Sequence, residues 1–467
     1  IVALAEALEK RQEKIDDPEI LPKVTKDDIP LSRNYPKPDI FVSNNIENYF
    51  YKSGTNGLVY HSMLFPCEAL DNDELKIASL FTSSLTDVVL GSDSYEDVQK
   101  YQSSITGGIS ASFAMIPNAG GLEHKLALKI SGKSLEKNAH LMQDLMLRTV
   151  QEANFDERQR IQELLSFISA DNEQSLTQNG HILAMANAAS QLTEVASTND
   201  FTSGVRFISN TGLLSKNIDN NDNLDIYIKN LKSIQSKISL TPKNIFTASS
   251  LDQNEMNLKS FAELNAADVD EQDFISIQDK SIGWITGSQV CFCAEAFPTV
   301  DSSHEDAPAL SVLGTVLRNG YLHSAIREKG GAYGAGAMQD SHNSVFKFFS
   351  YRDPKCTETF TEFNNAREWS LNNITNAHLD EGVLGVISSI DKPMSPYGEA
   401  MNDFMSELDH KNQKDRLLFR NKVKECSIED LVRVSKKYLF NESKKSVIAG
   451  ESFQDEIQNL GFSLKNI

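Results

Sequence analysis

The sequence predicts an α+β protein made of two tandem homologous repeats, each a largely antiparallel sheet with helices packed on one face. Its 467 residues are enough for two to four domains. A strand pattern that ends in Phe-Pro occurs twice, at Phe65-Pro66 and at Phe297-Pro298, and a helical pattern follows each time. Strands separated both by hairpins and by helices favour a mixed, largely antiparallel sheet.

The first copy opens with a strand over 57–66 that a proline closes. Asp71–Glu74 then starts a helix, because apolar side chains recur on one face of the segment that follows. These side chains are Leu75, Ala78, Phe81, Leu85 and Val88. A strand over 126–131, a long helix over 135–153 and a closing strand over 243–248 complete the expected unit.

The second copy repeats this order. A strand over 288–298 again ends at Phe-Pro, and His304–Asp306 starts the next helix. The apolar face of that helix consists of Leu310, Leu313, Leu317 and Tyr321. A strand over 345–350, a long helix over 357–374 and a closing strand over 445–450 follow. The matching order supports a duplicated unit of about 220 residues.

Two loops also correspond between the copies. The Gly-Gly turn within Thr106–Ser110 matches the one within Lys329–Tyr333. Asp156 and Asp380 occupy matching positions before a long helix, and we expect both side chains to be N-caps. A duplication of this kind commonly builds a pseudo-symmetric shell around a cleft.

The expected division of the chain has four parts. Residues 1–30 form a helical linker or hairpin arm, 31–250 the first repeat, 251–275 an acidic connector, and 276–467 the second repeat. The opening Ile1–Leu8 predicts a helix rather than a signal peptide, because an acidic residue interrupts it and no basic leader precedes it. The missing initiator Met indicates a fragment or a processed product.

Charge and cysteine content restrict the function. Lys+Arg 45 against Asp+Glu 65 gives a net charge of −20, which argues against binding to nucleic acid or to an anionic membrane. No apolar run reaches the ~18–20 residues of a membrane span, so we expect a soluble protein. The few, odd-numbered cysteines indicate a reducing compartment without a disulfide framework, cytoplasmic if bacterial and an organelle matrix if eukaryotic. The five are Cys67, Cys291, Cys293, Cys356 and Cys426.

The sequence contains no recognisable catalytic metal or nucleophile motif. No two of the nine histidines have the spacing that binds zinc from one helix face, and neither His-x-x-Glu-His nor His-Glu-x-x-His occurs. Cys291-x-Cys293 puts two thiols on one face of a strand but lacks a second pair, so we interpret them as buried structural cysteines. A nucleophile elbow, a P-loop and a dinucleotide fingerprint are also missing. We therefore expect no metal site in this chain.

One segment, Tyr321–Gly336, has both a structural and a functional interpretation. Structurally, it is a helix that ends at Lys329 with Gly330 as its C-cap. Functionally, Arg327 and Tyr333 flank a compact turn, so their side chains would converge on one point of a cleft. A fixed cation and a phenol suit binding of a peptide carbonyl and stabilisation of an oxyanion. The substrate-binding positions we expect beside them, where glycine lets the backbone approach a ligand, are Gly330, Gly331 and Gly334.

Three segments carry a resemblance to a known family. Arg327–Gly334, Phe349–Pro354 and Leu384–Pro393 resemble the C-terminal half of presequence proteases, which belong to the insulinase or pitrilysin (M16) family of inverzincin metallopeptidases. The resemblance extends over essentially the whole chain. It implies half of a clamshell, in which each half holds two α+β repeats and a helical hairpin, including 1–30, joins the halves.

The resemblance also implies a division of labour. In the family, zinc is bound in the N-terminal half by His-x-x-Glu-His and a distal Glu, whereas the corresponding helix here, Ser83–Val89, has no ligand. Zinc would therefore belong to the missing half of an intact zinc metalloendopeptidase, and this chain alone would be inactive. Arg327 and Tyr333 would reach across a closed chamber, orient the substrate carbonyl and stabilise the tetrahedral intermediate. Chamber size would select unfolded peptides, and an acidic wall would favour basic ones.

An alternative stays open at this stage. Processing-peptidase-like and respiratory-complex core subunits resemble the same fold without zinc, so the chain would then be a stand-alone, non-catalytic M16-like binding or assembly subunit. The sequence that precedes Ile1 in the gene distinguishes the two hypotheses. An upstream His-x-x-Glu-His segment favours the peptidase half, and an initiator Met near Ile1 favours the stand-alone subunit. Arg327 and Tyr333 favour the peptidase, since a scaffold has no need of an oxyanion clamp.

Overall fold

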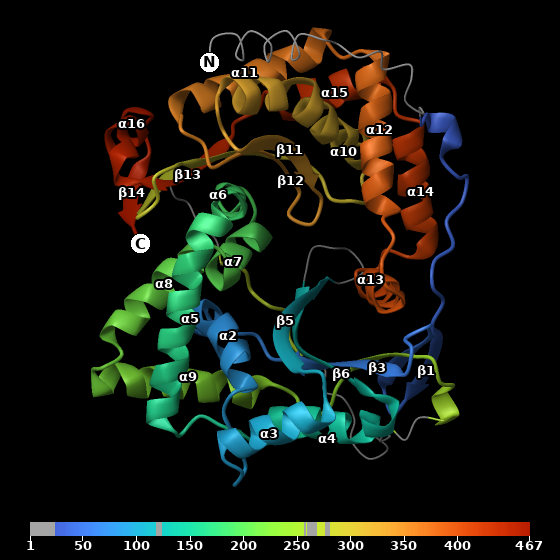
Figure 1. Ribbon diagram of the computed structural model, residues 1–467, viewed down its shortest axis with the longest axis vertical. Coiled ribbons are helices and arrows are strands. Elements are labelled where there is room, and N and C mark those ends of the chain that lie inside the picture. The colour runs from blue at the N-terminus through green and yellow to red at the C-terminus, as the bar shows by residue number, and fades with distance from the viewer. Residues whose placement is uncertain (1–23, 118–123, 256–257, 259–268, 276–280) are drawn as a thin grey trace, which may run out of the picture.

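The computed structural model describes residues 24–117, 124–255, 258, 269–275 and 281–467. Two six-stranded sheets, one from each half of the chain, lie one above the other in Figure 1, with most helices on their outer sides. The expected helix at Ile1–Leu8 lies outside the described residues. Among the described helices, none is long and apolar enough to cross a membrane.

The first sheet is mixed and mainly antiparallel. Its strand order is β1-β2-β8-β3-β6-β5, and only the β2–β8 pair is parallel. The central strand β3 contains the first Phe-Pro pair and is buried over most of its length. The strands are β1 (Asp39–Ser43), β2 (Ile46–Lys52), β3 (Leu58–Cys67), β5 (Ile109–Pro117), β6 (His124–Leu135) and β8 (Asn244–Ser249). A separate short pair consists of β4 (Val89–Leu90) and β7 (Ala153–Asn154).

The second sheet follows the same plan. Its order is β11-β12-β10-β13-β9-β14, with β13 and β14 parallel to β9 and the other pairs antiparallel. Strand β10 contains the second Phe-Pro pair at the place that β3 has in the first sheet. The strands are β9 (Ile282–Thr286), β10 (Phe292–Pro298), β11 (Gly334–Asp340), β12 (Val345–Tyr351), β13 (Lys444–Gly450) and β14 (Ser463–Asn466).

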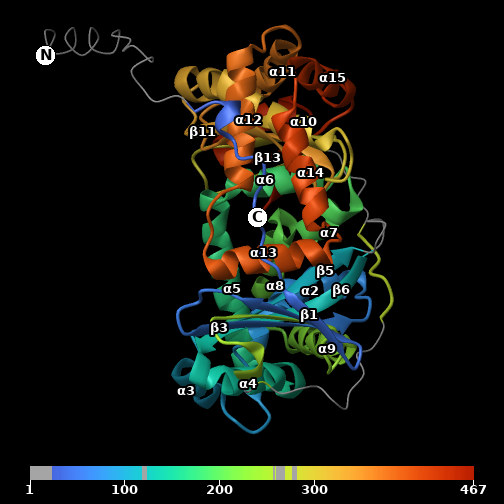
Figure 2. The same ribbon diagram turned by 90° about the vertical axis from the view of Figure 1, so that its right-hand side faces the viewer.

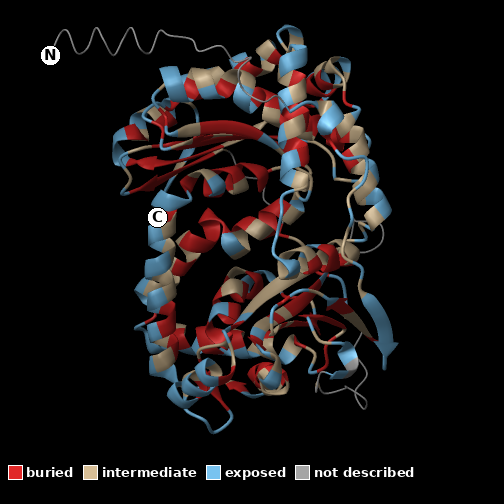
Figure 3. Ribbon diagram, turned by 45° about the vertical axis from the view of Figure 1, so that its right-hand side comes forward, coloured by how far each residue is buried: buried red, intermediate tan, exposed pale blue. Residues whose placement is uncertain are grey.

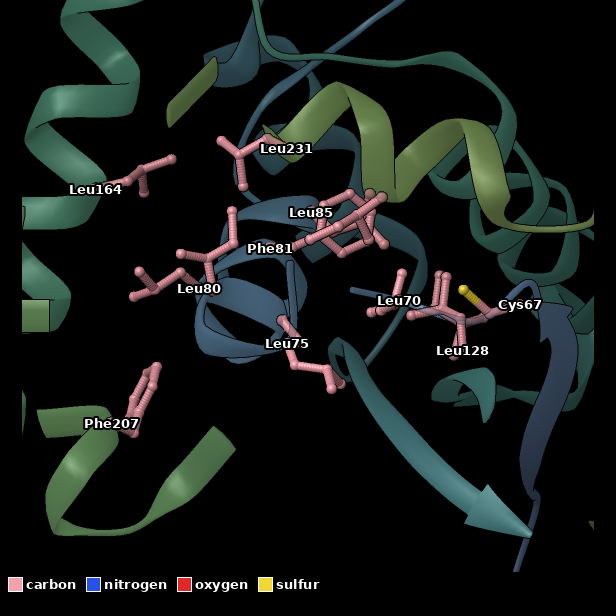
Figure 4. Packing of buried hydrophobic residues seen from close by; sticks show 14 of the residues in the cluster. Cys67, Leu70, Leu75, Leu80, Phe81, Leu85, Leu128, Leu164, Phe207 and Leu231 are labelled. Atoms are coloured by element: carbon pink, nitrogen blue, oxygen red, sulfur yellow. The ribbon is translucent and has the colours of Figure 1, made fainter. Parts of the chain in front are cut away.

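Helices with apolar faces cover the outer side of the first sheet. Helix α2 packs on β5 and α4 on β6, and the side chains predicted for the face of α2, such as Leu75 and Phe81, are buried in this core (Figure 4). The helices are α2 (Asn72–Leu85), α3 (Tyr95–Ile105), α4 (Ala139–Glu152), α5 (Arg158–Gln178), α7 (Glu194–Ser203), α8 (Val205–Asn217) and α9 (Asn221–Lys237). Short 3₁₀ turns are η2 (Lys26–Asp28), η3 (Glu136–Asn138) and η4 (Gln253–Glu255).

The second sheet has an equivalent layer of helices. Helix α10 packs on β11 and continues into a π-helical segment, η5 (Arg318–Lys329). The others are α10 (Ala307–Leu317), α11 (Thr357–Asn372), α12 (Asn376–Ile390), α14 (Gln413–Lys424), α15 (Ile428–Tyr438), η6 (Glu451–Phe453) and α16 (Gln454–Asn459). Figure 3 shows the strands of this sheet as a largely buried layer beneath these helices.

Each repeat contributes one helix to the inner face of the other repeat's sheet. Helix α6 (Gly180–Ala189) packs on β10, β12 and β13, and α13 (Pro396–Leu408) packs on the first sheet (Figures 1 and 2). The Tyr397 ring stacks on Tyr60 with centroids 4.1 Å apart, and Phe404 lies against Phe246. The two repeats are therefore tied together by reciprocal packing, which no local sequence pattern predicted.

The segment before β1 adds a second connection between the repeats. It runs beside α14, where Arg420 donates to the carbonyl oxygen of Pro30 at 2.8 Å and Lys424 donates to that of Ile29 at 3.2 Å. Arg420 is almost completely buried and is also paired with Asp391 at 2.6 Å. The chain thus crosses the second repeat before it forms the first strand of the first sheet.

Most expected elements are confirmed, including the α+β class, the two sheets and the strands that end in Phe-Pro. The two N-cap predictions are wrong. Asp380 lies inside α12, whose N-cap is Thr375, and Glu157 rather than Asp156 occupies the N-cap position of α5. Thr375 takes that position because its hydroxyl accepts from the backbone N–H of His378, which starts the helix earlier than the acidic residues suggested.

Candidate functional site

The π-helical segment η5 positions Arg327. It continues α10 without a break, and buried Leu322 and Ile326 anchor it on the core of the second repeat. The Arg327 side chain is exposed on the opposite side. Extended π-helix is rare, and short π-helical turns are frequent at functional sites, because the wider turn redirects side chains that an α-helix would point elsewhere.

The turn after η5 requires both of its glycines. Gly330 is the C-cap, as predicted, and a Cβ there would lie 2.4 Å from the carbonyl oxygen of Ile326. Gly331 has φ +90°, a backbone conformation that other residues adopt only with strain. Its N–H donates to the carbonyl of Arg327 at 3.1 Å, and the N–H of Ala332 donates to that of Ile326 at 3.1 Å. The chain therefore reverses directly after Arg327.

This reversal brings Arg327 and Tyr333 together, as the sequence predicted. The Arg327 guanidinium carbon lies 5.8 Å from the centre of the Tyr333 ring, a cation–π distance. The Tyr333 side chain is 65% exposed, whereas its backbone N–H is fixed by the carbonyl oxygens of Tyr351 at 3.1 Å and Arg352 at 3.3 Å. Gly334 then begins β11 opposite Tyr351. A rigid backbone thus presents two exposed side chains.

Sequence reasoning assigned no role to three neighbours of this pair. The Tyr351 ring meets the Tyr333 ring edge-on at 5.6 Å, and Arg352 (φ +47°) holds its guanidinium 5.4 Å from the Tyr351 ring. On the other side of Tyr351, the His181 ring from α6 lies 4.5 Å away between centroids. Tyr351 and Arg352 fall within a segment that carried the family resemblance, but nothing local marked His181, which comes from the other repeat.

The His181 imidazole lies at a junction of the two repeats. Burial lowers its pKa, and its Nδ1 atom is buried without a hydrogen-bond partner. The ring is therefore neutral at pH 7, and it packs against Phe349 as well as Tyr351. Tyr351, which contacts the Tyr333 ring, therefore packs against the neutral His181 ring on α6.

Two sizeable cavities of the described chain lie elsewhere. A cavity of about 550 Å³ between the repeats is lined by residues that include His124, His342 and His410, and one of about 500 Å³ lies between η5 and α11. Neither is lined by Arg327 or Tyr333, whose side chains are both exposed. The pair therefore stands on an open face of this chain.

Within the described part of the chain, one grouping of three potential metal ligands lies within 4.8 Å, and it consists of the buried thiols Cys291, Cys293 and Cys356. Catalytic zinc sites typically use histidine and carboxylate with an open coordination position. The residues that the structure describes offer no such set. Sequence reasoning missed Cys356 as a neighbour of the other two cysteines.

Comparisons with known proteins agree with this arrangement. Residues 1–212 match the family described as Peptidase M16 subfamily C associated, and residues 284–450 match the PreP C-terminal domain. The mitochondrial presequence protease of Yarrowia lipolytica is 30% identical over 467 residues, with 95% of this chain and 45% of that protein covered. The chain thus spans a little less than half the length of the curated relatives it matches.

Solved structures show the same fold. A protease from Helicobacter pylori has a TM-score of 0.61 at 16% identity and covers 89% of this chain and 100% of its own. The peptidase M16 inactive domain from Pseudomonas fluorescens also has a TM-score of 0.61, at 15% identity, and covers 89% of this chain and 98% of its own. The chain belongs to subfamily C of the M16 peptidases and corresponds to the C-terminal region of a presequence protease.

Proposed function

We propose that this chain is the substrate-binding part of a zinc metallopeptidase that degrades unfolded peptides in a closed chamber. The zinc and its general base would come from the N-terminal half of the same polypeptide. The observation that carries this proposal is that Arg327 and Tyr333 lie close together on an exposed face. Arg327 comes from the π-helical segment η5, and the turn that leads to Tyr333 needs two glycines.

The two side chains have complementary chemistry for peptide hydrolysis. Attack of water on a peptide carbonyl moves negative charge onto the carbonyl oxygen, and donors fixed at that point lower the barrier. The Arg327 guanidinium is permanently charged and donates in a planar fork, whereas the Tyr333 phenol donates one directed O–H. Gly330, Gly331 and Gly334 would leave room for the peptide backbone next to them.

The exposure of Arg327 and Tyr333 supports the proposal that the N-terminal half of the polypeptide covers them. Tyr333 is a large aromatic residue that is 65% exposed, although its backbone is anchored on both sides. The proposed domain division places 31–250 and 276–467 as the two repeats, with 251–275 between them. The net charge of −20 supports basic peptides as substrates, because an acidic protein attracts cations. We place the protein in solution in a reducing compartment.

The test is peptidase activity on a quenched basic peptide with zinc, using this chain together with the zinc-binding half of a family member. We expect activity only in the mixture. Tyr333→Phe should then lower kcat by ~10–10³-fold with a smaller effect on KM, because the hydroxyl would act mainly in the transition state. Arg327→Ala should lower kcat/KM at least as strongly.

The matched control is Tyr95→Phe, because Arg160 lies over the Tyr95 ring at 4.1 Å in the first repeat and forms a similar pair away from the site. It should leave kcat unchanged. If Tyr333→Phe is also silent in an active mixture, the catalytic role is wrong. Binding of peptides by this chain with no activity in any covalent or mixed form would instead favour the stand-alone binding subunit.

A further inference from the structure

Three cysteine thiols from two distant parts of the sequence meet inside the second repeat. Cys293 lies in β10, Cys291 directly precedes that strand, and Cys356 occupies the N-cap position of α11. The Sγ atoms of Cys291 and Cys293 are 3.8 Å apart, and those of Cys293 and Cys356 are 3.7 Å apart. All three sulfurs lie within 4.8 Å of one another.

The cluster is sealed from solvent. All three side chains have no exposed surface and belong to the hydrophobic core of the second repeat. The remaining nearby polar atoms are backbone oxygens, since Cys291 Sγ lies 3.3 Å from the carbonyl oxygen of Asp353 and 3.4 Å from that of Lys355. Among the described residues, no histidine or carboxylate joins the three sulfurs within the same distance.

The three sulfurs also contact one another directly. Cys293 Sγ donates to Cys356 Sγ at 3.7 Å and lies 3.8 Å from Cys291 Sγ. The cluster is therefore a compact group of soft sulfur donors inside the core.

We propose that the Sγ atoms of Cys291, Cys293 and Cys356 bind one monovalent copper ion in a three-coordinate site. Sulfurs at these separations place a central ion roughly 2.2–2.4 Å from each, close to the ~2.3 Å of metal–thiolate bonds. Thiolates are soft ligands that select Cu(I), whereas zinc in structural sites takes four ligands. Among the described residues, no fourth cysteine, histidine or carboxylate lies within the same distance of the three sulfurs.

Binding of Cu(I) needs no redox partner. The ion replaces the protons of the thiols that coordinate it, and these protons pass to solvent. No electron is transferred in this step.

The test is a titration of the reduced, full chain with Cu(I) under argon, in competition with a bicinchoninate or bathocuproine chelator. We expect one Cu(I) per chain and thiolate-to-copper absorbance in the near ultraviolet. Cys293→Ser and Cys356→Ser should each weaken binding at least ~100-fold, because each removes a ligand. Cys426→Ser is the matched control, because Cys426 is buried in the same core but lies outside the cluster.

A second measurement avoids variants that fold poorly. X-ray absorption at the copper edge of the loaded wild-type chain should show about three sulfur neighbours at ~2.2–2.3 Å. Stoichiometric binding with oxygen or nitrogen neighbours, or binding that survives Cys356→Ser unchanged, would overturn the proposal. Preferential uptake of zinc over Cu(I) in a parallel titration would also overturn it, because it would show a four-coordinate site.

Discussion

Strands β3 and β10 occupy the same place in the two repeats but carry different chemistry. Relative to the Phe-Pro pair, His61 of β3 matches Cys293 of β10, and Val59 matches Cys291. His61 is buried and bonded to the Thr247 hydroxyl at 2.9 Å, whereas Cys293 lies in the thiol cluster. The duplicated scaffold thus fixes the positions and leaves the side chains free to differ, so function has to be read from the residues.

The two Gly-Gly turns make the same point. Gly108 and Gly331 both have positive φ, at +112° and +90°, so the backbone device is shared. Ser104 stands where the second repeat has Arg327, and Ser110 stands where it has Tyr333. The first repeat therefore has the turn without the cation and the phenol. The following predictions test how far this difference between repeats extends.

The largest effect is expected at the exchanged helix α6. The Asn187 side chain is fully buried there, accepts from Trp284 Nε1 at 3.0 Å and Ser446 Oγ at 2.8 Å, and donates to Asp200 at 2.7 Å. Asn187→Leu should lower the free energy of unfolding by about 3–5 kcal/mol, because it leaves buried polar groups without partners. Urea unfolding followed by tryptophan fluorescence measures this.

The matched variant at the other exchanged helix is Tyr51→Phe. The Tyr51 hydroxyl donates to Asp403 of α13 at 3.0 Å, but Asp403 keeps Arg416 as a partner. This change should cost only about 1 kcal/mol. If Asn187→Leu and Tyr51→Phe lower the free energy of unfolding equally, α6 and α13 are held with similar strength. The predicted difference between the two exchanged helices would then be wrong.

Acid should destabilise the protein through His61. Burial lowers the pKa of His61 from 6.5 to about 4, so the unfolded chain binds this proton first as the pH falls. The stabilisation is complete above pH 6.5 and is lost as the pH falls towards 4, by about 3 kcal/mol. Urea midpoints at several pH values should show this slope in the wild type and a reduced slope in His61→Asn. Equal slopes of urea midpoint against pH in the wild type and in His61→Asn would contradict this role of His61.

At the two turns we expect a small and equal effect on stability but different effects on activity. Gly108→Ala and Gly331→Ala should each cost about 1 kcal/mol, because both positions have positive φ and neither added Cβ meets a close atom. Only Gly331→Ala should lower peptidase activity in the reconstituted mixture, because it moves Arg327 relative to Tyr333. Equal loss of activity in both variants would show that the turn in the first repeat also serves the site.

Local patterns were sufficient to predict much of the fold. The Phe-Pro strands, the apolar face of α2 and the Gly-Gly turn were all predicted, because each depends on residues close in sequence. The convergence of Arg327 with Tyr333 was predicted for the same reason. Sequence patterns did not give the π-helical form of η5, since nothing in its composition distinguishes it from an ordinary helix.

Long-range contacts account for what was missed. Cys356 joins Cys293 only because the β11–β12 hairpin brings the start of α11 back to the start of β10. His181 reaches Tyr351 only because α6 crosses into the other repeat. The wrong N-cap at Asp380 has a different cause, since Thr375 offered a cap nearer the start of the helix. Such contacts leave no periodic signal in a single sequence.

The exchange of helices has a consequence during synthesis. The last strand of the first sheet ends at Ser249, but Phe404, which covers Phe246 on its inner face, belongs to a helix that begins at Pro396. At ~5–20 residues per second a ribosome needs roughly 7–30 s to make the intervening chain. During that interval the nascent first repeat presents an uncovered aromatic face, which is a binding surface for chaperones and a site for misassembly until its partner helix emerges.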